Sequence, residues 1–191
     1  MKLIFATQNE NKVAEIQKLM PKNIKVLSLK DIDCSDDIPE NEPTLEGNAL
    51  VKARHIAKKY NVNCFSDDTG LEIEALNGEP GVKSARYAGE EKDSNQNMDL
   101  VLQKLKGNPN RTAQFRTAIA LIIDGKETVF EGIVTGIIRT EKTGEQGFGY
   151  DPIFEPENTG KTFAEMSTTE KNTMSHRGRA IKKMVDFLAR L

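Results

Sequence analysis

The feature that most constrains the fold is a pair of long, mainly apolar segments at residues 111–123 and 126–139. Both have the composition and alternation of long β-strands. Asp124-Gly125 lies between them, and this dipeptide is a strong signal for a two-residue hairpin turn. We therefore predict an antiparallel hairpin at residues 111–139, built from strands more than twice the usual length.

The rest of the chain interleaves strands and helices. We expect further strands at 3–6, 24–29, 62–65 and 71–76. We expect helices at 9–20, 45–60 and 97–106, a short helix after Ser167, and a last helix that carries Ala180 to Leu188 on its inner face. This order predicts an α/β fold with a mixed sheet and flanking helices. A chain of 191 residues is expected to form a single domain, residues 1–191.

Composition excludes several classes of protein. The net charge is −2, and Lys and Arg are scattered among Asp and Glu, which argues against a nucleic-acid partner. No apolar run is long enough to span a membrane, and the amino-terminal apolar run is too short for a signal peptide, so we expect a cytoplasmic protein without a membrane partner. Two histidines and two cysteines are too few for a His-rich or Cys-rich zinc site. Cys34 and Cys64 are expected to be buried free thiols, although a disulfide is possible.

The first candidate site is the junction between the first strand and the first helix. A helix that begins directly after a strand presents free backbone N–H groups and the positive end of its dipole, which suits phosphate. Taken alone, the segment also fits an ordinary helix start with a Thr7–Glu10 capping box. A P-loop is excluded, because Gly78 to Ser84 has the wrong spacing. The segment reads Thr7, Gln8, Asn9, Glu10, Asn11, Lys12.

The second candidate site is Asp67-Asp68, which we expect at the end of a strand. Adjacent carboxylates in that position can hold Mg²⁺, which binds few protein ligands and takes the rest from water and phosphate. Glu40 lies in an acidic loop and is a further candidate ligand. The alternative is an Asp-rich turn exposed to water.

Two further candidates follow later in the chain. In Gly147-Phe148-Gly149-Tyr150-Asp151, glycines flank an aromatic residue, so the backbone can approach a flat ligand while the ring stacks on it. Lys171 and Ser175-His176-Arg177 gather cations and a histidine near a helix boundary, which suits an anion or a carbonyl group. Each also fits ordinary surface structure when considered alone.

In this order, the motifs resemble the inosine triphosphate pyrophosphatase family. The likeness covers essentially the whole chain, and Thr69 stands where serine is usual. The matching pieces are Thr7-x-Asn9-x-x-Lys12, Glu40 ahead of Thr44 and Asn48-Ala49, Ser66-Asp67-Asp68-Thr69-Gly70-Leu71, Pro80-Gly81-Val82-x-Ser84-Ala85-Arg86-Tyr87-Ala88-Gly89, Gly147 to Pro152, Lys171-Asn172 and Ser175-His176-Arg177.

The resemblance implies an elongated mixed sheet with two lobes around a deep nucleotide-binding cleft. It also implies a homodimeric enzyme that hydrolyses ITP, dITP or XTP to the monophosphate and pyrophosphate. By resemblance, Asp68 is the catalytic base and binds Mg²⁺ together with Glu40. The substrate-binding residues that it implies are Thr7, Gln8, Asn9, Glu10, Asn11, Lys12, Thr69, Phe148, Gly149, Tyr150, Asp151, Lys171, His176 and Arg177.

Two alternatives remain. The related Maf-type pyrophosphatases share the architecture and act on other nucleotides, but the Ser175-His176-Arg177 segment and the Phe148 to Asp151 loop argue against them. A non-catalytic nucleotide sensor would keep the phosphate cradle and could dispense with the carboxylates. Glu40, Asp67 and Asp68 are all present, which favours the enzyme.

Overall fold

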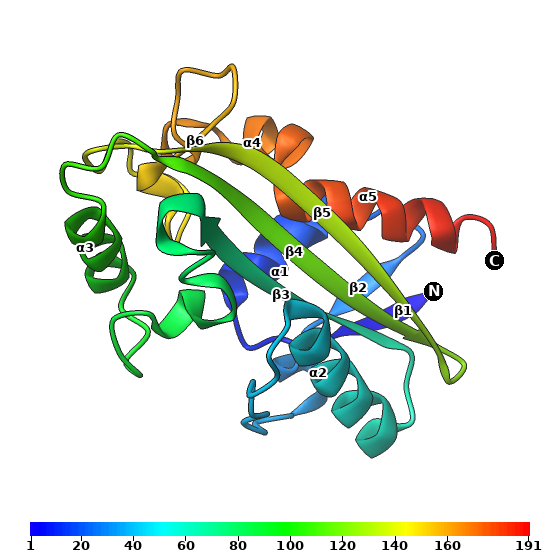
Figure 1. Ribbon diagram of the computed structural model, residues 1–191. Coiled ribbons are helices and arrows are strands. Elements are labelled where there is room, and N and C mark those ends of the chain that lie inside the picture. Colours follow the sequence, from blue (N-terminus) through cyan, green and yellow to red (C-terminus); the bar gives the residue numbers. More distant parts are fainter. The chain divides into compact units, whose positions relative to one another are not determined.

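The computed structural model describes residues 1–191 and contains a six-stranded sheet in the order β2-β1-β3-β4-β5-β6 (Figure 1). The strands are β1 Lys2–Phe5, β2 Lys25–Leu27, β3 Cys64–Ile73, β4 Thr112–Ile123, β5 Lys126–Ile138 and β6 Phe154–Pro156. The helices are α1 Glu10–Leu19, α2 Leu45–Tyr60, α3 Ser94–Lys104, α4 Thr168–Met174 and α5 His176–Leu188. β1 runs parallel to β2 and β3, whereas β6 is antiparallel to β5. The predicted mixed α/β class is confirmed.

The chain divides into two compact units. Unit 1 comprises Met1–Asp68, Thr117–Gly132 and Arg177–Leu191, and unit 2 comprises Thr69–Arg116 and Ile133–His176. Each of β3, β4 and β5 contributes residues to both units. The predicted hairpin is confirmed, and its turn is Asp124-Gly125, with φ of 48° and 78°. Positive φ at both turn residues is typical of the type I′ turn that matches the twist of paired strands.

In unit 1, the sheet separates two apolar cores. Leu3 and Phe5 lie in the core beneath α1 and α5, where Phe5 stacks on Phe65 with a centroid distance of 4.6 Å. Ile4 and Ala6 lie in the other core, against α2. Successive side chains of a strand point to opposite faces, so β1 supplies both cores in turn. Unit 1 is therefore a sheet covered by helices on both faces.

α1 begins at Glu10, and its cap differs from the expected capping box. The Asn9 side-chain oxygen accepts hydrogen bonds from the backbone N–H groups of Asn11 at 3.0 Å and Lys12 at 3.3 Å. The Asn9 N–H in turn donates to Thr7 Oγ1 at 3.1 Å. Asparagine is among the best N-cap residues, because its short side chain reaches the free N–H groups of the first turn. The Thr7–Glu10 capping box is therefore wrong.

β3 is longer and more regular than expected. The strand runs without interruption from Cys64 to Ile73. The Asp67-Asp68 pair therefore lies inside a strand, and the expectation that it lies at a strand end is wrong. The polar run at 66–70 has the composition of a turn. β3 lies between β1 and β4 in the sheet, however, and its place in the sheet overrides that local preference, although the pairing with β1 ends at Phe65.

Unit 2 has its own core, formed by the inner face of α3, parts of β3, β4 and β5, and the aromatic residues Phe115, Phe154 and Phe163. α3 begins three residues earlier than expected, because Asp93 caps it through the backbone N–H of Gln96. β6 is a short strand that the sequence analysis did not predict. The first residues of α4 follow Ser167, which caps them as expected.

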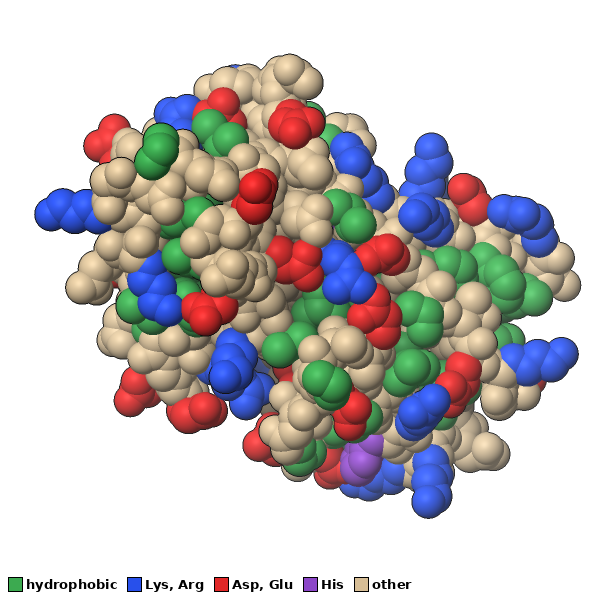
Figure 2. All heavy atoms as spheres, in the orientation of Figure 1, with side chains coloured by type: hydrophobic (Ala, Val, Ile, Leu, Met, Phe, Trp, Pro, Cys, Tyr) green, Lys and Arg blue, Asp and Glu red, His purple; other side chains and the backbone are tan.

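Both cysteines are free and buried, which confirms the preferred expectation for Cys34 and Cys64. No helix has the length and apolar character that crossing a bilayer requires. On the face shown in Figure 2, basic and acidic side chains are interspersed.

Phe5 gives a direct test of the unit 1 core. Phe5→Ala removes a fully buried ring that stacks on Phe65, so we expect a loss of about 3–5 kcal/mol in the free energy of unfolding. Val129, with 41% of its surface exposed, is the control, and Val129→Ala should change stability by less than about 0.5 kcal/mol. Urea unfolding followed by circular dichroism measures both. Equal effects of the two substitutions would contradict this description of the core.

Candidate functional site

Asp67 and Asp68 point to opposite faces of the sheet because β3 continues through both. Phe65, two residues before Asp67, lies in the core beneath α1 and α5, and Cys64 lies in the core against α2. The same alternation directs Asp67 toward α1 and α5, and Asp68 toward α2. Two adjacent carboxylates thus have different partners.

Asp67 is completely enclosed by cations. Its Oδ1 lies 2.9 Å from Lys12 Nζ on α1, and its Oδ2 accepts from Arg177 Nε on α5 at 3.1 Å. Arg177 also pairs with Glu15 on α1. Burial by itself would raise the pKa of Asp67, but the charges of Lys12, Arg177 and Lys52 outweigh burial and hold that pKa far below its ordinary value of 3.8. Asp67 is therefore a permanent anion that joins α1, β3 and α5.

Asp68 has a different environment. Its Oδ2 accepts from Asn48 Nδ2 on α2 at 3.0 Å. Burial raises the pKa of Asp68, and Glu40 adds to this effect, while Lys52, Lys12 and the Asn48 bond oppose it. A carboxylate with a raised pKa is a stronger proton acceptor. When the pKa values of two neighbouring acids are shifted in opposite directions, the two groups are suited to different roles.

Lys52 on α2 connects the carboxylates of this site. Its Nζ donates to Glu40 Oε1 at 2.9 Å and to the backbone oxygen of Asp67 at 2.7 Å. Burial by itself would lower the pKa of Lys52, but Asp68, Glu40 and Asp67 outweigh it and raise that pKa. Lys52 is therefore a buried, fully charged lysine.

The donor set fits a hard divalent cation. Asp68 and Glu40 offer carboxylate oxygens, which Mg²⁺ and similar ions prefer. The structure contains no cluster of three or more potential metal ligands. Mg²⁺ does not need such a cluster, because it is usually held by one or two carboxylates and completes its shell with water and phosphate oxygens.

The start of α1 lies in the same unit. Asn9 caps the first turn, and the Gln8 side chain donates to the backbone oxygen of Asp36 at 2.9 Å, which ties the segment to the acidic loop. Gln8, Asn9, Glu10 and Asn11 are all exposed. The segment thus presents an accessible helix amino terminus, as expected for anion binding.

In unit 2, the carboxylate of Asp151 closes the glycine-rich loop. Asp151 Oδ2 accepts from the backbone N–H of Phe148 at 3.0 Å and pairs with Lys171 Nζ at 2.7 Å. Lys171 Nζ also lies 4.8 Å from the centroid of the Phe148 ring. A Cβ atom at Gly147, where φ is +75°, would lie 2.1 Å from Asp151 Oδ2, so only glycine fits there. The structure thus brings together Phe148, Asp151 and Lys171.

The motif at 80–89 supports this loop. Tyr150 is buried, and its hydroxyl donates to the backbone oxygen of Ser84 at 2.6 Å. Burial raises the pKa of that phenol, so Tyr150 stays protonated. Ser84 Oγ also accepts from the backbone N–H of Leu71, and Asn97 holds the same segment through Ala85 and Ala88. The role of this motif in unit 2 is to position the Phe148 loop.

His176 and Arg177 are both deeply buried. His176 is 3% exposed and stacks on Phe115 with a centroid distance of 4.6 Å. Arg177 is 2% exposed and pairs with Asp67 and Glu15. Arg177 thus holds Asp67 in unit 1, and His176 packs against the aromatic core of unit 2.

Sequence reasoning missed Glu15 and Lys52, and it identified Asp67 only as a possible metal ligand. A signal existed for Glu15 and Lys52. Glu15 lies three positions after Lys12, and Lys52 lies four positions after Asn48, so each shares a helix face with a residue that the motifs had identified. A buried helix face that carries charged side chains at helical spacing indicates a functional or paired site.

Together, these features define a mixed α/β protein in which one unit combines an accessible helix amino terminus, two adjacent carboxylates with different environments and a buried lysine, an arrangement suited to a hydrolase that binds a polyphosphate. The Ham1 family model matches residues 3–187, and the chain belongs to the Ham1 family. This finding confirms the family resemblance inferred from the motifs.

Individual relatives are similar over their full length. The chain is 55% identical to the dITP/XTP pyrophosphatase of Flavobacterium johnsoniae over 188 residues, which cover 98% of each chain. It is 47% identical to the dITP/XTP pyrophosphatase of Bacillus subtilis, with 97% of this chain and 96% of the relative covered. The solved structure of a HAM1 protein from Coxiella burnetii matches with a TM-score of 0.92 and 36% identity, over all of both chains.

The enclosed position of Asp67 predicts a large, pH-dependent effect on stability. Asp67→Asn leaves the buried charges of Lys12 and Arg177 without their common partner. We therefore expect the free energy of unfolding to fall by about 3–5 kcal/mol at neutral pH. The pKa of Asp67 is lowered in the folded protein. Its stabilising charge is therefore present above the ordinary pKa of 3.8 and is lost as the pH falls toward the folded-state pKa.

The difference in the free energy of unfolding between Asp67→Asn and the unsubstituted protein should thus become smaller in acid. Urea unfolding at neutral pH and below the ordinary aspartate pKa measures it. Asp37→Asn, at an exposed carboxylate of the same unit, is the control and should leave stability nearly unchanged. A difference that stays constant or grows in acid would contradict the role assigned to Asp67.

Proposed function

We propose that this protein hydrolyses non-standard purine nucleoside triphosphates, ITP, dITP and XTP, to the monophosphate and pyrophosphate. The observation that carries the proposal is the opposite environment of the two adjacent carboxylates, a locked anion at Asp67 and a more basic carboxylate at Asp68. Family membership and the names of the relatives support the substrate class.

In this proposal, Asp68 is the general base. It accepts a proton from the water that attacks the α-phosphorus, while the bond between that phosphorus and the bridging oxygen breaks and pyrophosphate leaves. Asn48 orients the carboxylate through its bond to Oδ2. The raised pKa of Asp68 brings its basicity closer to the operating pH, which favours proton transfer.

The local charge balance supports a divalent cation as a cofactor. Near β3, Lys12, Lys52 and Arg177 face four carboxylates, those of Glu15, Glu40, Asp67 and Asp68. Such a site has no surplus of positive charge for a polyanionic triphosphate. We propose that Mg²⁺, held by Glu40 and Asp68, supplies that charge when bound and polarises the phosphate oxygens.

The start of α1 has the properties of a triphosphate cradle. In this proposal, phosphate oxygens replace the Asn9 amide oxygen as acceptors for the N–H groups of Asn11 and Lys12. Thr7, Gln8 and Glu10 complete the segment, and Thr69 offers a hydroxyl directly after Asp68 in β3. Lys12 stabilises the charge that develops on the leaving pyrophosphate.

Unit 2 supplies the residues that we propose to bind the purine ring of the substrate. The Phe148 ring can stack on any purine, which contributes affinity without selectivity. Hypoxanthine and xanthine carry a carbonyl at C6, where adenine carries an amino group. The ammonium of Lys171 and the backbone N–H groups of Gly149 and Tyr150 can donate to that carbonyl, and an unmet buried donor disfavours adenine by about 1–3 kcal/mol. By the family resemblance, we propose that His176 in unit 2 and Arg177 in unit 1 also belong to the nucleotide-binding residues.

By the same family resemblance, we propose that the protein acts in the cytoplasm as a homodimer. Size-exclusion chromatography with light scattering tests the dimer.

The experiment that tests the function measures pyrophosphate release from ITP, dITP, XTP, GTP and ATP, with Mg²⁺ and after rigorous chelation. We expect release from ITP, dITP and XTP only, loss of activity with EDTA and recovery with Mg²⁺. A preference for other nucleotides would favour the Maf-type alternative. Binding of ITP without turnover would favour the sensor. Full activity after chelation would exclude the metal-assisted mechanism.

Asp68 gives the sharpest test of the mechanism. Asp68→Asn keeps the size of the side chain and removes its basicity, so turnover should fall by at least about 10²-fold. For the unsubstituted enzyme, kcat/KM should rise with pH as Asp68 ionises, and this acid limb should be absent from the residual activity of Asp68→Asn. Asp186→Asn, on the exposed face of α5, is the control and should retain turnover. Near-normal turnover by Asp68→Asn would falsify the assignment.

A further inference from the structure

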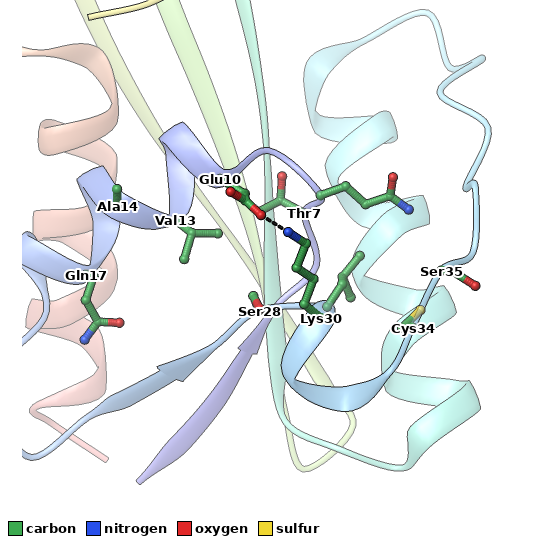
Figure 3. Close-up of a pocket in the computed structure, with 11 residues that line it drawn as sticks. Thr7, Glu10, Val13, Ala14, Gln17, Ser28, Lys30, Cys34 and Ser35 are labelled. Carbon is green, nitrogen blue, oxygen red and sulfur yellow. Dashed lines mark hydrogen bonds and ion pairs between the residues drawn. The ribbon is translucent and has the colours of Figure 1, made fainter.

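Two faces of α1 contact different surroundings. Lys12 and Glu15 face the ion pairs with Asp67 and Arg177. Glu10, Val13, Ala14 and Gln17 instead line a cavity of about 700 Å³ in unit 1 (Figure 3). These four residues have the spacing i, i+3, i+4 and i+7, which is one continuous stripe along a helix.

The opposite wall of this cavity comes from the segment after β2. The remaining lining residues are Thr7, Gln8, Ser28, Leu29, Lys30, Cys34 and Ser35. Glu40, Asn48, Lys52, Asp67 and Asp68 are not among them. The cavity is thus distinct from the carboxylate site, although Thr7, Gln8 and Glu10 belong to both the cavity and the phosphate segment.

The far wall is a fixed part of the fold. Leu29 and Cys34 are 3% and 6% exposed and are joined by a backbone hydrogen bond from the Cys34 N–H to the Leu29 oxygen at 2.9 Å. Ser28 is held through its N–H and its hydroxyl by the carboxylate of Asp31, at 2.7 and 2.9 Å. The cavity is therefore preformed, and its volume lies within the range of roughly 300–1,000 Å³ that is usual for small-molecule sites.

The chemistry of the lining selects against charged ligands. Val13, Ala14, Leu29 and Cys34 provide apolar surface, and Gln17 and the serines provide neutral polar groups. Glu10 and Lys30 are the two charged lining residues, and they pair with each other (Figure 3). Their charges cancel, so the cavity offers no net attraction to a phosphate or to a cation. Both side chains are largely exposed, so separating this pair costs little.

We propose that this cavity is an accessory binding site for a small uncharged molecule with an apolar body and a few hydrogen-bonding groups, and that the phosphate segment senses its occupancy. The sensing follows from the shared residues. A ligand that packs against Val13 and Ala14 restrains the first two turns of α1, whose start is also the cradle proposed for phosphate. Binding at one site then changes affinity at the other, and the coupling is reciprocal.

The test uses indole, a neutral aromatic probe, and two matched variants. Indole is titrated into the ¹⁵N-labelled protein without nucleotide, and amide chemical shifts are recorded by NMR, so the result does not depend on the proposed activity. We expect saturable shifts at Val13, Ala14, Gln17, Leu29 and Cys34. Ala14→Trp fills the cavity from an exposed helix position and should abolish them. Lys18→Trp places the same side chain one turn later on α1, outside the lining, and should retain them.

The thiols give a second readout. N-ethylmaleimide, also neutral and small, should label Cys34 from the cavity and spare Cys64, which is fully buried and lies outside the lining. Indole should slow the labelling of Cys34. Circular dichroism confirms that both tryptophan variants are folded. Shifts that do not saturate, shifts elsewhere in the protein, or equal indole affinity in the Ala14→Trp and unsubstituted proteins would overturn the site.

Inorganic tripolyphosphate, which mimics the polyphosphate without a base, tests the coupling. Indole affinity should change when tripolyphosphate is present, and the affinity for tripolyphosphate should change by the same factor when indole is present. Identical indole affinities with and without bound tripolyphosphate would overturn the coupling.

Discussion

The structure of the candidate site depends on one backbone constraint, the unbroken course of β3 through Asp67 and Asp68. A turn at this point would have left both carboxylates in water with similar properties. A strand sends them to opposite faces, where α1 and α5 enclose one with Lys12 and Arg177, and α2 presents Asn48 to the other. Because side chains alternate along the strand, Asp67 is held in ion pairs, whereas Asp68 keeps the basicity that the proposed catalysis needs.

Unit 2 follows a similar plan, in which one buried carboxylate organises a loop. Asp151 receives the Phe148 N–H and the Lys171 ammonium, and Gly147 provides the space that this arrangement needs. Tyr150 then attaches the loop to the segment around Ser84. In both units, a permanent ion pair fixes side chains whose proposed partners are a phosphate chain and a purine. Preorganisation of this kind reduces the entropic cost of binding.

Several elements could be predicted from the sequence, since their signals are local. The hairpin at β4 and β5 follows from alternation and from Asp124-Gly125. The start of α2 follows from the cap at Thr44, and that of α4 from the cap at Ser167. The candidate site residues were identified mainly because their motifs resemble a known family. The Thr7–Glu10 capping box and the strand end expected at Asp67-Asp68 were wrong, because Asn9 rather than Thr7 caps the first turn of α1 and because β3 continues through Asp67 and Asp68 to Ile73.

The sequence by itself determined the fold class, the family and the residue types of the candidate site, because periodicity, turn residues and motif order are local properties of the chain. It did not determine the environment of each side chain. The opposite pKa shifts of Asp67 and Asp68, the buried ion pair of Arg177 with Glu15 and the position of Lys52 beside Glu40 were decided by the tertiary structure. The physical reason is that burial and charge interactions depend on distances between residues far apart in the chain, and folding alone sets these distances.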